Sequence, residues 1–451
     1  MTITRKLTKY VCQHDISLQE ALSKIETNRK GFLLVLQGDV AVGVITDGDI
    51  RRLLLEGSFC TARKVIDFCN KRFVFALENE PDENVISLFS EKIKFVPILN
   101  KNGCLTDLRF SDEVDRKPRQ SIIKTRAPSR ITFGGGGSDK PDYFSHRNGL
   151  CITAAIKKYA FCSLSERRHG DGIRIKSSDF GCCWDFDSAE ELMHSNDPRL
   201  LIYQKVFSFV DFFQDVEIQT HCDFPIGSGL GGSSSLTVAM LHAFSQLQVV
   251  DIPKILLAKN AYKLERVAMN VSGGWQDQYA AAVGGINAIF FSKAGHDVHN
   301  IRLSDTVLRE LEASLYLCFS GRVHDSSEIH QSINLKNVDR LADMQETVRL
   351  AREMLTALTN EDLSNFDQNM NQNWELKKNY SEKITNDILD DDIRKFRAAG
   401  ATSAKILGAG GGGYFLLRVP AENHARFHSY CYENNILAER VLFDTEGVVN
   451  W

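Results

Sequence analysis

Two sets of short apolar runs separated by polar turns occupy the first part of the chain. The first set comprises a helical segment, an apolar run, a polar turn, a second apolar run and another helical segment, at residues 18–25, 31–36, 37–39, 40–46 and 49–55. The second set repeats the first four of these, at residues 83–89, 94–99, 100–103 and 104–109. Short apolar runs bounded by turn residues are typical of buried strands. The pattern predicts two copies of one unit within residues 1–117, followed by a domain boundary at the polar segment 112–120, which contains Pro118.

A glycine- and serine-rich loop, residues 225–235, dominates the rest of the pattern, and an apolar stretch at residues 203–220 leads into it. Four glycines in the loop, at positions 227, 229, 231 and 232, permit positive φ angles and close approach of a ligand. Apolar residues then recur with helical spacing from Leu236 to Leu247. A loop of this kind before a helix N-terminus offers free N–H groups and a positive dipole end, which bind phosphate. A flexible linker is the alternative, but a linker would not lie between an apolar run and an amphipathic helix.

Two further segments carry a distinct pattern. Residues 252–269 predict a helix, opened by Asp251 with Pro253 in its first turn. Residues 408–413 contain five glycines between two apolar runs, at 404–407 and 414–417. A hairpin turn needs fewer glycines, so this run indicates close approach of backbone to backbone or to a ligand.

Composition narrows the class of protein. The chain has 451 residues, enough for two or three domains, and its 43% hydrophobic and 25% charged content is ordinary for a globular protein. A net charge of −4 gives no electrostatic case for nucleic acid or an anionic membrane. The 11 cysteines show no Cys-x2-Cys spacing, which favours reduced thiols over a zinc site. With no signal peptide and no membrane-spanning run, we predict a cytoplasmic protein.

The loop motif Pro225-Ile-Gly-Ser-Gly-Leu-Gly-Gly-Ser-Ser-Ser235 resembles the second motif of the GHMP kinases. Residues 126–143 resemble the first motif of that family, and residues 408–413 resemble the third. The resemblance implies an α+β fold with two lobes, an N-lobe at 121–300 and a ferredoxin-like C-lobe at 301–451. It also implies an enzyme that uses ATP and Mg²⁺. The expected nucleotide-binding residues are Pro225, Gly227, Ser228, Gly229, Leu230, Gly231, Gly232, Ser233 and Ser234.

The same resemblance assigns the catalytic residues and the metal ligands. Asp277, in the segment 272–285, matches the family's catalytic aspartate, and Arg130 is expected beside it. Asp277 could accept the proton of the attacking hydroxyl or only orient that hydroxyl. Ser233 and Glu265 match the hydroxyl and carboxylate ligands of Mg²⁺, although Ser234 competes with Ser233 for that register. As alternatives for single residues, Asp277 could be a turn cap and Glu265 a solvated helix charge.

Within the family, residues 126–139, 273–282 and 374–378 are most similar to the D-glycero-D-manno-heptose 7-phosphate kinase branch. This implies transfer to the anomeric C1 hydroxyl of a sugar phosphate, on a route to nucleotide-activated heptose. A kinase for fucose or another hexose is one alternative, and a catalytically silent nucleotide sensor is another. The expected substrate-binding residues, including three cations for the sugar's phosphate, are Gly136, Gly137, Ser138, Asp139, Arg322, Lys377, Lys405, Gly410 and Gly411.

The repeated N-terminal unit resembles a tandem CBS-domain pair. The segment from Gly43 to Asp49 matches that family's ribose-binding pattern, in which Thr46 contacts nucleotide phosphate and Asp49 contacts ribose. The second copy lacks the equivalent glycine. The resemblance therefore implies an adenine nucleotide site and a homodimer, while a scaffold that binds nothing is an equal alternative.

Overall fold

The structure is a computed structural model that describes residues 7–28, 30–55, 63–90, 93–111, 122–168, 170–212, 214–322, 329 and 338–451. The chain divides into two compact units, Met1–Arg119 and Gln120–Trp451. The predicted boundary segment 112–120 lies outside the described residues. Among the residues that are described, no helix combines the length and the apolar character needed to cross a lipid bilayer.

The first unit contains the repeat that the sequence predicted. One three-stranded sheet has the order β1-β2-β3 and the other has the order β4-β5-β6. In both sheets the first pair of strands is parallel and the second pair is antiparallel. The elements are β1 (Val11–Gln13), α1 (Leu18–Asn28), β2 (Phe32–Gln37), β3 (Val40–Thr46), α2 (Asp47–Leu55), β4 (Ala76–Leu77), α3 (Asp82–Ser87), β5 (Phe95–Leu99) and β6 (Leu105–Phe110).

Successive side chains of β2 pack into two different cores, which explains why the two copies stay together. Leu33 and Val35 pack with Ile25 of α1 in the core of the first copy. Leu34 and its neighbours on the opposite face pack with Leu108 and other residues of the second copy in one shared cluster. Because successive strand residues point to opposite faces, β2 is buried on both sides.

An eight-stranded sheet forms the first part of the second unit. Its continuous order is β10-β9-β11-β8-β12-β13, and β7 pairs with both β8 and β18. The strands are β7 (Ile123–Gly134), β8 (Gly149–Glu166), β9 (Ile173–Ser177), β10 (Cys182–Phe186), β11 (Val216–Cys222), β12 (Ile286–Ser292), β13 (Gly295–Asn300) and β18 (Val449–Asn450).

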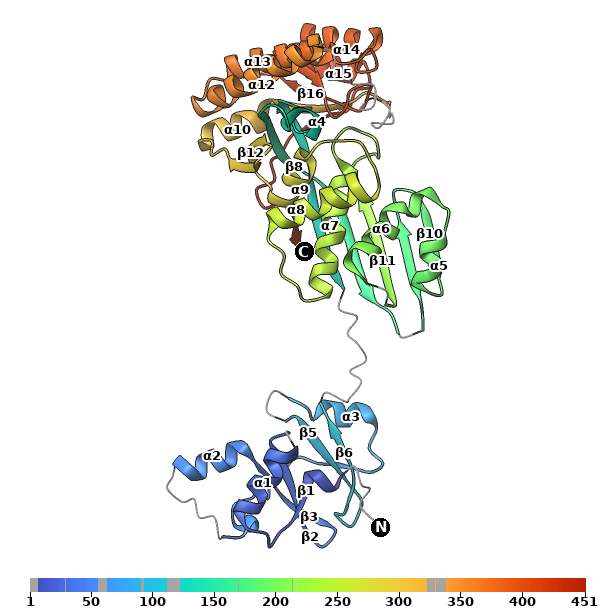
Figure 1. Cartoon of the computed structure of the whole chain (residues 1–451), viewed down its shortest axis with the longest axis vertical. Helices are drawn as coiled ribbons and strands as arrows, with labels where there is room; N and C mark the ends of the chain where they lie inside the picture. The colour runs from blue at the N-terminus through green and yellow to red at the C-terminus, as the bar shows by residue number, and fades with distance from the viewer. Residues whose placement is uncertain are drawn as a thin grey trace. The chain divides into compact units, whose positions relative to one another are not determined.

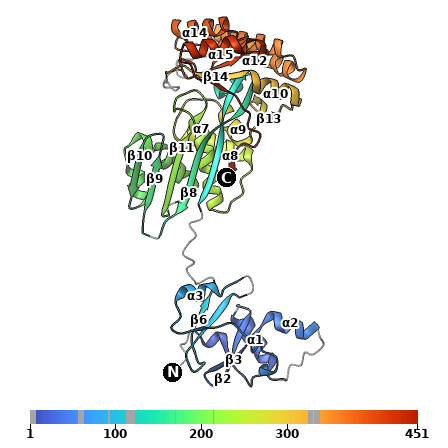
Figure 2. The same cartoon turned by 180° about the vertical axis from the view of Figure 1, so that it is seen from behind.

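Helices cover one face of this sheet, as the views from front and back show (Figures 1 and 2). The helices of this part are α4 (Pro141–Phe144), α5 (Ala189–His194), α6 (Leu201–Val210), α7 (Gly232–Leu247), α8 (Lys254–Tyr262) and α9 (Gln276–Val283). Cys151 and Leu164 of β8 pack against this helical layer. Leu150 and Ile152 point to the other face, where they join the core of the C-terminal part. The sheet therefore has two buried faces.

The C-terminal part contains a four-stranded antiparallel sheet with the order β15-β16-β14-β17. Its elements are α10 (Asp305–Ser314), β14 (Leu315–Phe319), α12 (Val338–Thr359), α13 (Leu363–Lys378), α14 (Asp387–Ala398), β15 (Ser403–Ile406), β16 (Tyr414–Arg418), α15 (His424–Glu433) and β17 (Ala438–Arg440). This order, with helices between β14 and β15 and between β16 and β17, confirms the predicted ferredoxin-like lobe. The chain then returns to the large sheet through β18, which a division at residue 301 did not anticipate.

The helix predicted for residues 252–269 differs from the observed one in two ways. It starts at Lys254, with Pro253 as its N-cap and no side-chain cap, so the predicted cap at Asp251 is wrong. It also changes into a π-helix over Lys263–Ala268. π-Helical turns are rare and occur mostly at functional sites, and this one carries Glu265.

Candidate active site

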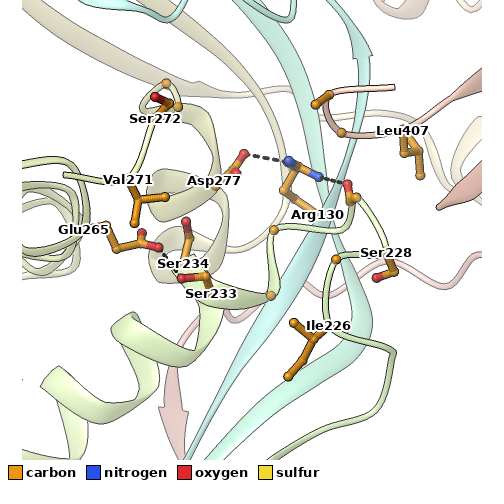
Figure 3. A pocket seen from close by; sticks show the side chains of 18 of the residues that line it. Arg130, Ile226, Ser228, Ser233, Ser234, Glu265, Val271, Ser272, Asp277 and Leu407 are labelled. Carbon is orange, nitrogen blue, oxygen red and sulfur yellow. Dashed lines mark hydrogen bonds and ion pairs between the residues drawn. The ribbon is translucent and has the colours of Figure 1, made fainter. Parts of the chain in front are cut away.

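A cavity of about 530 Å³ lies in the second unit, where the glycine- and serine-rich loop meets segments from both lobes. Most of the residues singled out in the sequence line it. Figure 3 shows side chains from the loop, the π-helix and α9 converging around this space. The charged and hydroxyl side chains in its polar wall include Arg130, Asp139, Lys140, Ser233, Ser234, Glu265, Arg266, Asp277, Lys377 and Lys405.

The loop has the backbone conformation that its glycines permit. Gly227, Gly229 and Gly231 have φ angles of 75°, 83° and 79°, in the left-handed region that side chains disfavour. Helix α7 begins at Gly232 directly behind them. The N–H groups of its first turn have no acceptor within the helix, so this end of the cavity suits an anion. Pro225 and Leu230 do not line the cavity; Leu230 is buried and its carbonyl accepts the Arg130 N–H.

The glycine run at 408–413 packs against this loop. A Cβ on Gly413 would lie 2.3 Å from the Ser228 carbonyl oxygen, and one on Gly408 would lie 2.6 Å from the Gly229 Cα. The predicted close approach is therefore between two backbones. Gly410 packs against Ile384 and does not line the cavity, and neither does Gly411. The structure does not bring these two glycines to the predicted substrate site.

Arg130, which is buried, and Asp277, which is partly buried, form an ion pair in the cavity wall. Arg130 Nε donates to Asp277 Oδ1 at 2.7 Å, and a terminal guanidinium nitrogen donates to the Gly229 carbonyl oxygen at 2.7 Å (Figure 3). Gly231 lets the loop lie against this pair, since its Cβ would be 3.4 Å from Asp277 Cγ. Arg130 therefore links the carboxylate to the glycine- and serine-rich loop.

Glu265 is fully buried and forms no ion pair with any described residue. Its carboxylate accepts hydrogen bonds from Ser233 Oγ at 2.7 Å and from Gln278 Nε2 at 2.5 Å. Gln278 Nε2 also donates to Ser234 Oγ at 2.9 Å. A buried charge is costly unless it is paired or binds a metal, and oxygen ligands suit Mg²⁺. These residues therefore fit a magnesium ion. Sequence reasoning gave no role to Gln278, although it directly follows Asp277 in the chain.

Asp139 lies against a glycine of the segment that leads into α9. A Cβ on Gly274 would be only 1.9 Å from Asp139 Oδ2. The carboxylate accepts N–H groups from Gly137 and Gln276, each at 3.1 Å. Burial, together with the nearby Asp277, raises the Asp139 pKa, while these N–H donors lower it. Ser138 instead serves the fold, because its hydroxyl bonds the backbone of Gly135 and Leu150.

Two of the three predicted substrate cations line the cavity and one does not. Lys377 donates to the Gly408 carbonyl oxygen at 2.5 Å, and Lys405 donates to the Phe133 carbonyl oxygen at 2.9 Å. Burial lowers the pKa of Lys405 to about 7 and lowers that of Lys377 well below its usual range. Neither lysine forms an ion pair with a residue that the structure describes. Arg322 is exposed and lies outside the cavity lining.

An apolar region forms another wall of the cavity. It contains Phe180, Leu201, Ile202, Phe224, Ile226, Leu236 and Met269. These residues come from several separate segments of the chain, so no single local pattern marks them as a group. Sequence reasoning therefore missed them.

Thr46 and Asp49, in the first unit, bond each other at the start of α2. Asp49 Oδ2 accepts from the Thr46 N–H at 2.9 Å and from Thr46 Oγ1 at 2.7 Å. Thr46 Oγ1 accepts the Asp49 N–H at 3.3 Å. This reciprocal arrangement is a capping box. The pair thus has a structural role in the fold, whether or not it also binds a nucleotide.

Comparisons with known proteins agree with this geometry. Residues 201–285 match the model of the GHMP kinases N terminal domain, and residues 354–428 match that of the GHMP kinases C terminal domain. A D-glycero-alpha-D-manno-heptose 7-phosphate kinase from Campylobacter jejuni is 31% identical over 338 residues, covering 73% of this chain and 98% of that protein. The chain belongs to the GHMP kinase family. It is a sugar or sugar-phosphate kinase, a phosphotransferase with an alcohol as acceptor.

A solved structure and a second relative agree with this assignment to the GHMP kinase family, and a further match lies in the N-terminal unit. A D-glycero-D-manno-heptose 1-phosphate kinase structure from Bacteroides thetaiotaomicron superimposes with a TM-score of 0.60 at 27% identity, covering 73% of this chain and 98% of that one. A bifunctional fucokinase/GDP-fucose pyrophosphorylase from Arabidopsis thaliana is 27% identical over 71% of this chain and 33% of that protein. Residues 4–56 match the CBS domain, which confirms the family of the first N-terminal copy.

Proposed function

We propose that this kinase transfers the γ-phosphate of ATP to the C1 hydroxyl of D-glycero-D-manno-heptose 7-phosphate. The observation that carries this proposal is a pair of lysines in the cavity wall, Lys405, which is buried, and Lys377, which is partly buried. Burial disfavours their charged forms, as their lowered pKa values indicate. An anionic substrate would restore those charges and gain strong hydrogen bonds from them. A neutral sugar would leave two buried amines without a counter-charge.

The chain's own residues account for the chemistry of transfer. The loop and the N-terminus of α7 would bind the phosphates of ATP, and the apolar wall would contact its adenine ring. Ser233 and Glu265 would hold Mg²⁺, which when bound neutralises charge on the nucleotide phosphates. Asp139 would hold sugar hydroxyls. Asp277 would accept the proton of the attacking hydroxyl or orient that hydroxyl. Arg130, which contacts both Asp277 and the loop, would stabilise the negative charge that develops during transfer.

Substrate preference tests this function directly. We expect kcat/KM for heptose 7-phosphate to exceed that for free heptose, fucose or mannose by about tenfold or more, because a charge-assisted hydrogen bond contributes about 1.5–3 kcal/mol. A coupled assay of ADP release would measure the rates, and phosphorus NMR of the product would locate the new phosphate at C1. The Arabidopsis relative favours fucose as the second candidate. Equal use of free fucose would contradict the heptose phosphate assignment.

For the N-terminal unit we propose an adenine nucleotide site at Thr46 and Asp49, on a unit that also forms a homodimer. Its support is the CBS match at residues 4–56. AMP, ADP or ATP should then raise the melting temperature of the full chain through this site as well as through the kinase cavity. Thr46→Ala with Asp49→Ala should reduce the AMP-dependent shift by the contribution of this site and leave the contribution of the kinase cavity.

Because the same two substitutions remove a capping box, they should also cost about 1 kcal/mol of stability without ligand. Each melting temperature is therefore compared with that of the same variant without nucleotide. An AMP-dependent shift that is unchanged in the double variant would contradict nucleotide binding by these residues and favour a scaffold.

A further inference from the structure

Arg266 is a cation of the cavity wall that no motif singled out. It follows Glu265 on the π-helix, and both residues line the cavity. Its Nε atom is buried without a hydrogen-bond partner, and its guanidinium forms no ion pair with any described residue. A guanidinium that is partly removed from water and left unpaired is costly, and five N–H donors make it well suited to a phosphate. The unpaired guanidinium of Arg266 therefore indicates an anionic ligand in this part of the cavity.

A pair of adjacent glycines places Arg266 beside the proposed sugar site. A Cβ on Gly273 would lie 2.6 Å from Arg266 Cζ, so the guanidinium rests on this residue. The next residue, Gly274, makes the equivalent close contact with the Asp139 carboxylate. Glycine at both positions allows the Arg266 guanidinium and the Asp139 carboxylate to pack against one short segment of backbone.

Lys140 supplies a second positive charge at this place. It follows Asp139 in the chain, lines the cavity and forms no ion pair with any residue that the structure describes. Burial lowers its pKa, and the charge of Arg266 lowers it further, against opposing contributions from Asp139 and Asp142. Two cations that repel each other in a half-buried wall would both be stabilised by one dianion between them.

We propose that Arg266 and Lys140 form a subsite for the distal phosphate of the sugar substrate and select phosphorylated sugars over free ones. This inference rests on the proposed function, because it assumes a sugar-phosphate acceptor. Lys377 and Lys405 then complete the positive wall from the C-terminal lobe. Arg322, which the sequence favoured for this role, lies outside the cavity and is replaced by residues of the N-lobe.

Steady-state kinetics of Arg266→Gln will test the subsite, with Lys263→Gln as the matched control. Lys263 is an exposed cation on the same π-helix and does not line the cavity. We expect Arg266→Gln to raise KM for heptose 7-phosphate about tenfold or more, with kcat and the KM for ATP nearly unchanged. Arg266→Lys should recover part of the loss, Lys140→Gln should act in the same direction, and Lys263→Gln should behave as the wild type.

Kinetics with free heptose separate a failure of the proposed function from a failure of the proposed phosphate subsite. Its KM should be the same in the wild type and in Arg266→Gln, because it has no phosphate to lose. If the wild type does not prefer the phosphorylated sugar, the proposed function fails. If the wild type prefers it and both Arg266→Gln and Lys140→Gln keep that preference in full while remaining folded by circular dichroism, the function stands and the subsite is overturned.

Discussion

Asp277→Asn will lower kcat by about two or more orders of magnitude, the usual contribution of one acid–base group. Asparagine has nearly the same size as aspartate and keeps an oxygen that can accept the 2.7 Å hydrogen bond from Arg130 Nε. The substitution therefore removes the negative charge and the proton acceptor while keeping the local packing. ATP affinity should change little, because the nucleotide phosphates are assigned to the loop and to the N-terminus of α7.

Single-turnover kinetics and nucleotide titration will measure these two quantities separately. Asp179→Asn is a suitable control, because Asp179 is another carboxylate of the cavity and accepts a hydrogen bond from the backbone N–H of Cys222 at 2.9 Å. It should turn over at close to the normal rate. Near-normal turnover of Asp277→Asn would refute the assignment, and an equal loss of ATP affinity would show that Asp277 instead supports the phosphate loop.

Gly274→Ala will weaken sugar binding, with a loss of kcat/KM of about 100-fold or more. The added methyl group would lie 1.9 Å from Asp139 Oδ2, a distance at which the carboxylate must move. Moving it breaks its hydrogen bonds to the N–H groups of Gly137 and Gln276. Two lost hydrogen bonds to a charged group correspond to about 3–6 kcal/mol before relaxation, which sets the size of the expected effect. ATP binding should persist, since none of these contacts involves the loop.

Calorimetric titration with the sugar phosphate and with ATP will check this separation. Lys263→Gln serves as the control, because Lys263 is exposed and does not line the cavity. It should leave both affinities unchanged. Sugar affinity that stays within about threefold of the wild type in Gly274→Ala would show that Asp139 does not hold the substrate.

Local patterns in the sequence were enough to predict most helices and strands and part of the candidate site. Glycine positions at 227, 229 and 231 predict a loop with positive φ angles, and the apolar spacing that follows predicts α7. The loop conformation and the helix both depend on neighbours within a few residues, so local composition and periodicity are enough to predict them. The N-terminal repeat was predicted in the same way, because each strand is bounded by its own turn residues.

Other parts of the site depend on contacts between distant segments, and only the tertiary structure decided them. Arg322 and Arg266 are both isolated cations in the sequence, yet packing leaves one exposed and places the other in the cavity. The glycines at 408 and 413 support the loop near residue 229 because two backbones meet there, across about 180 positions of chain. The π-helix that presents Glu265 has no local signal, since a residue inserted into a helix register is selected by tertiary packing. Sequence therefore determined which chemistry was present, and the packing of remote segments determined which residues share one cavity.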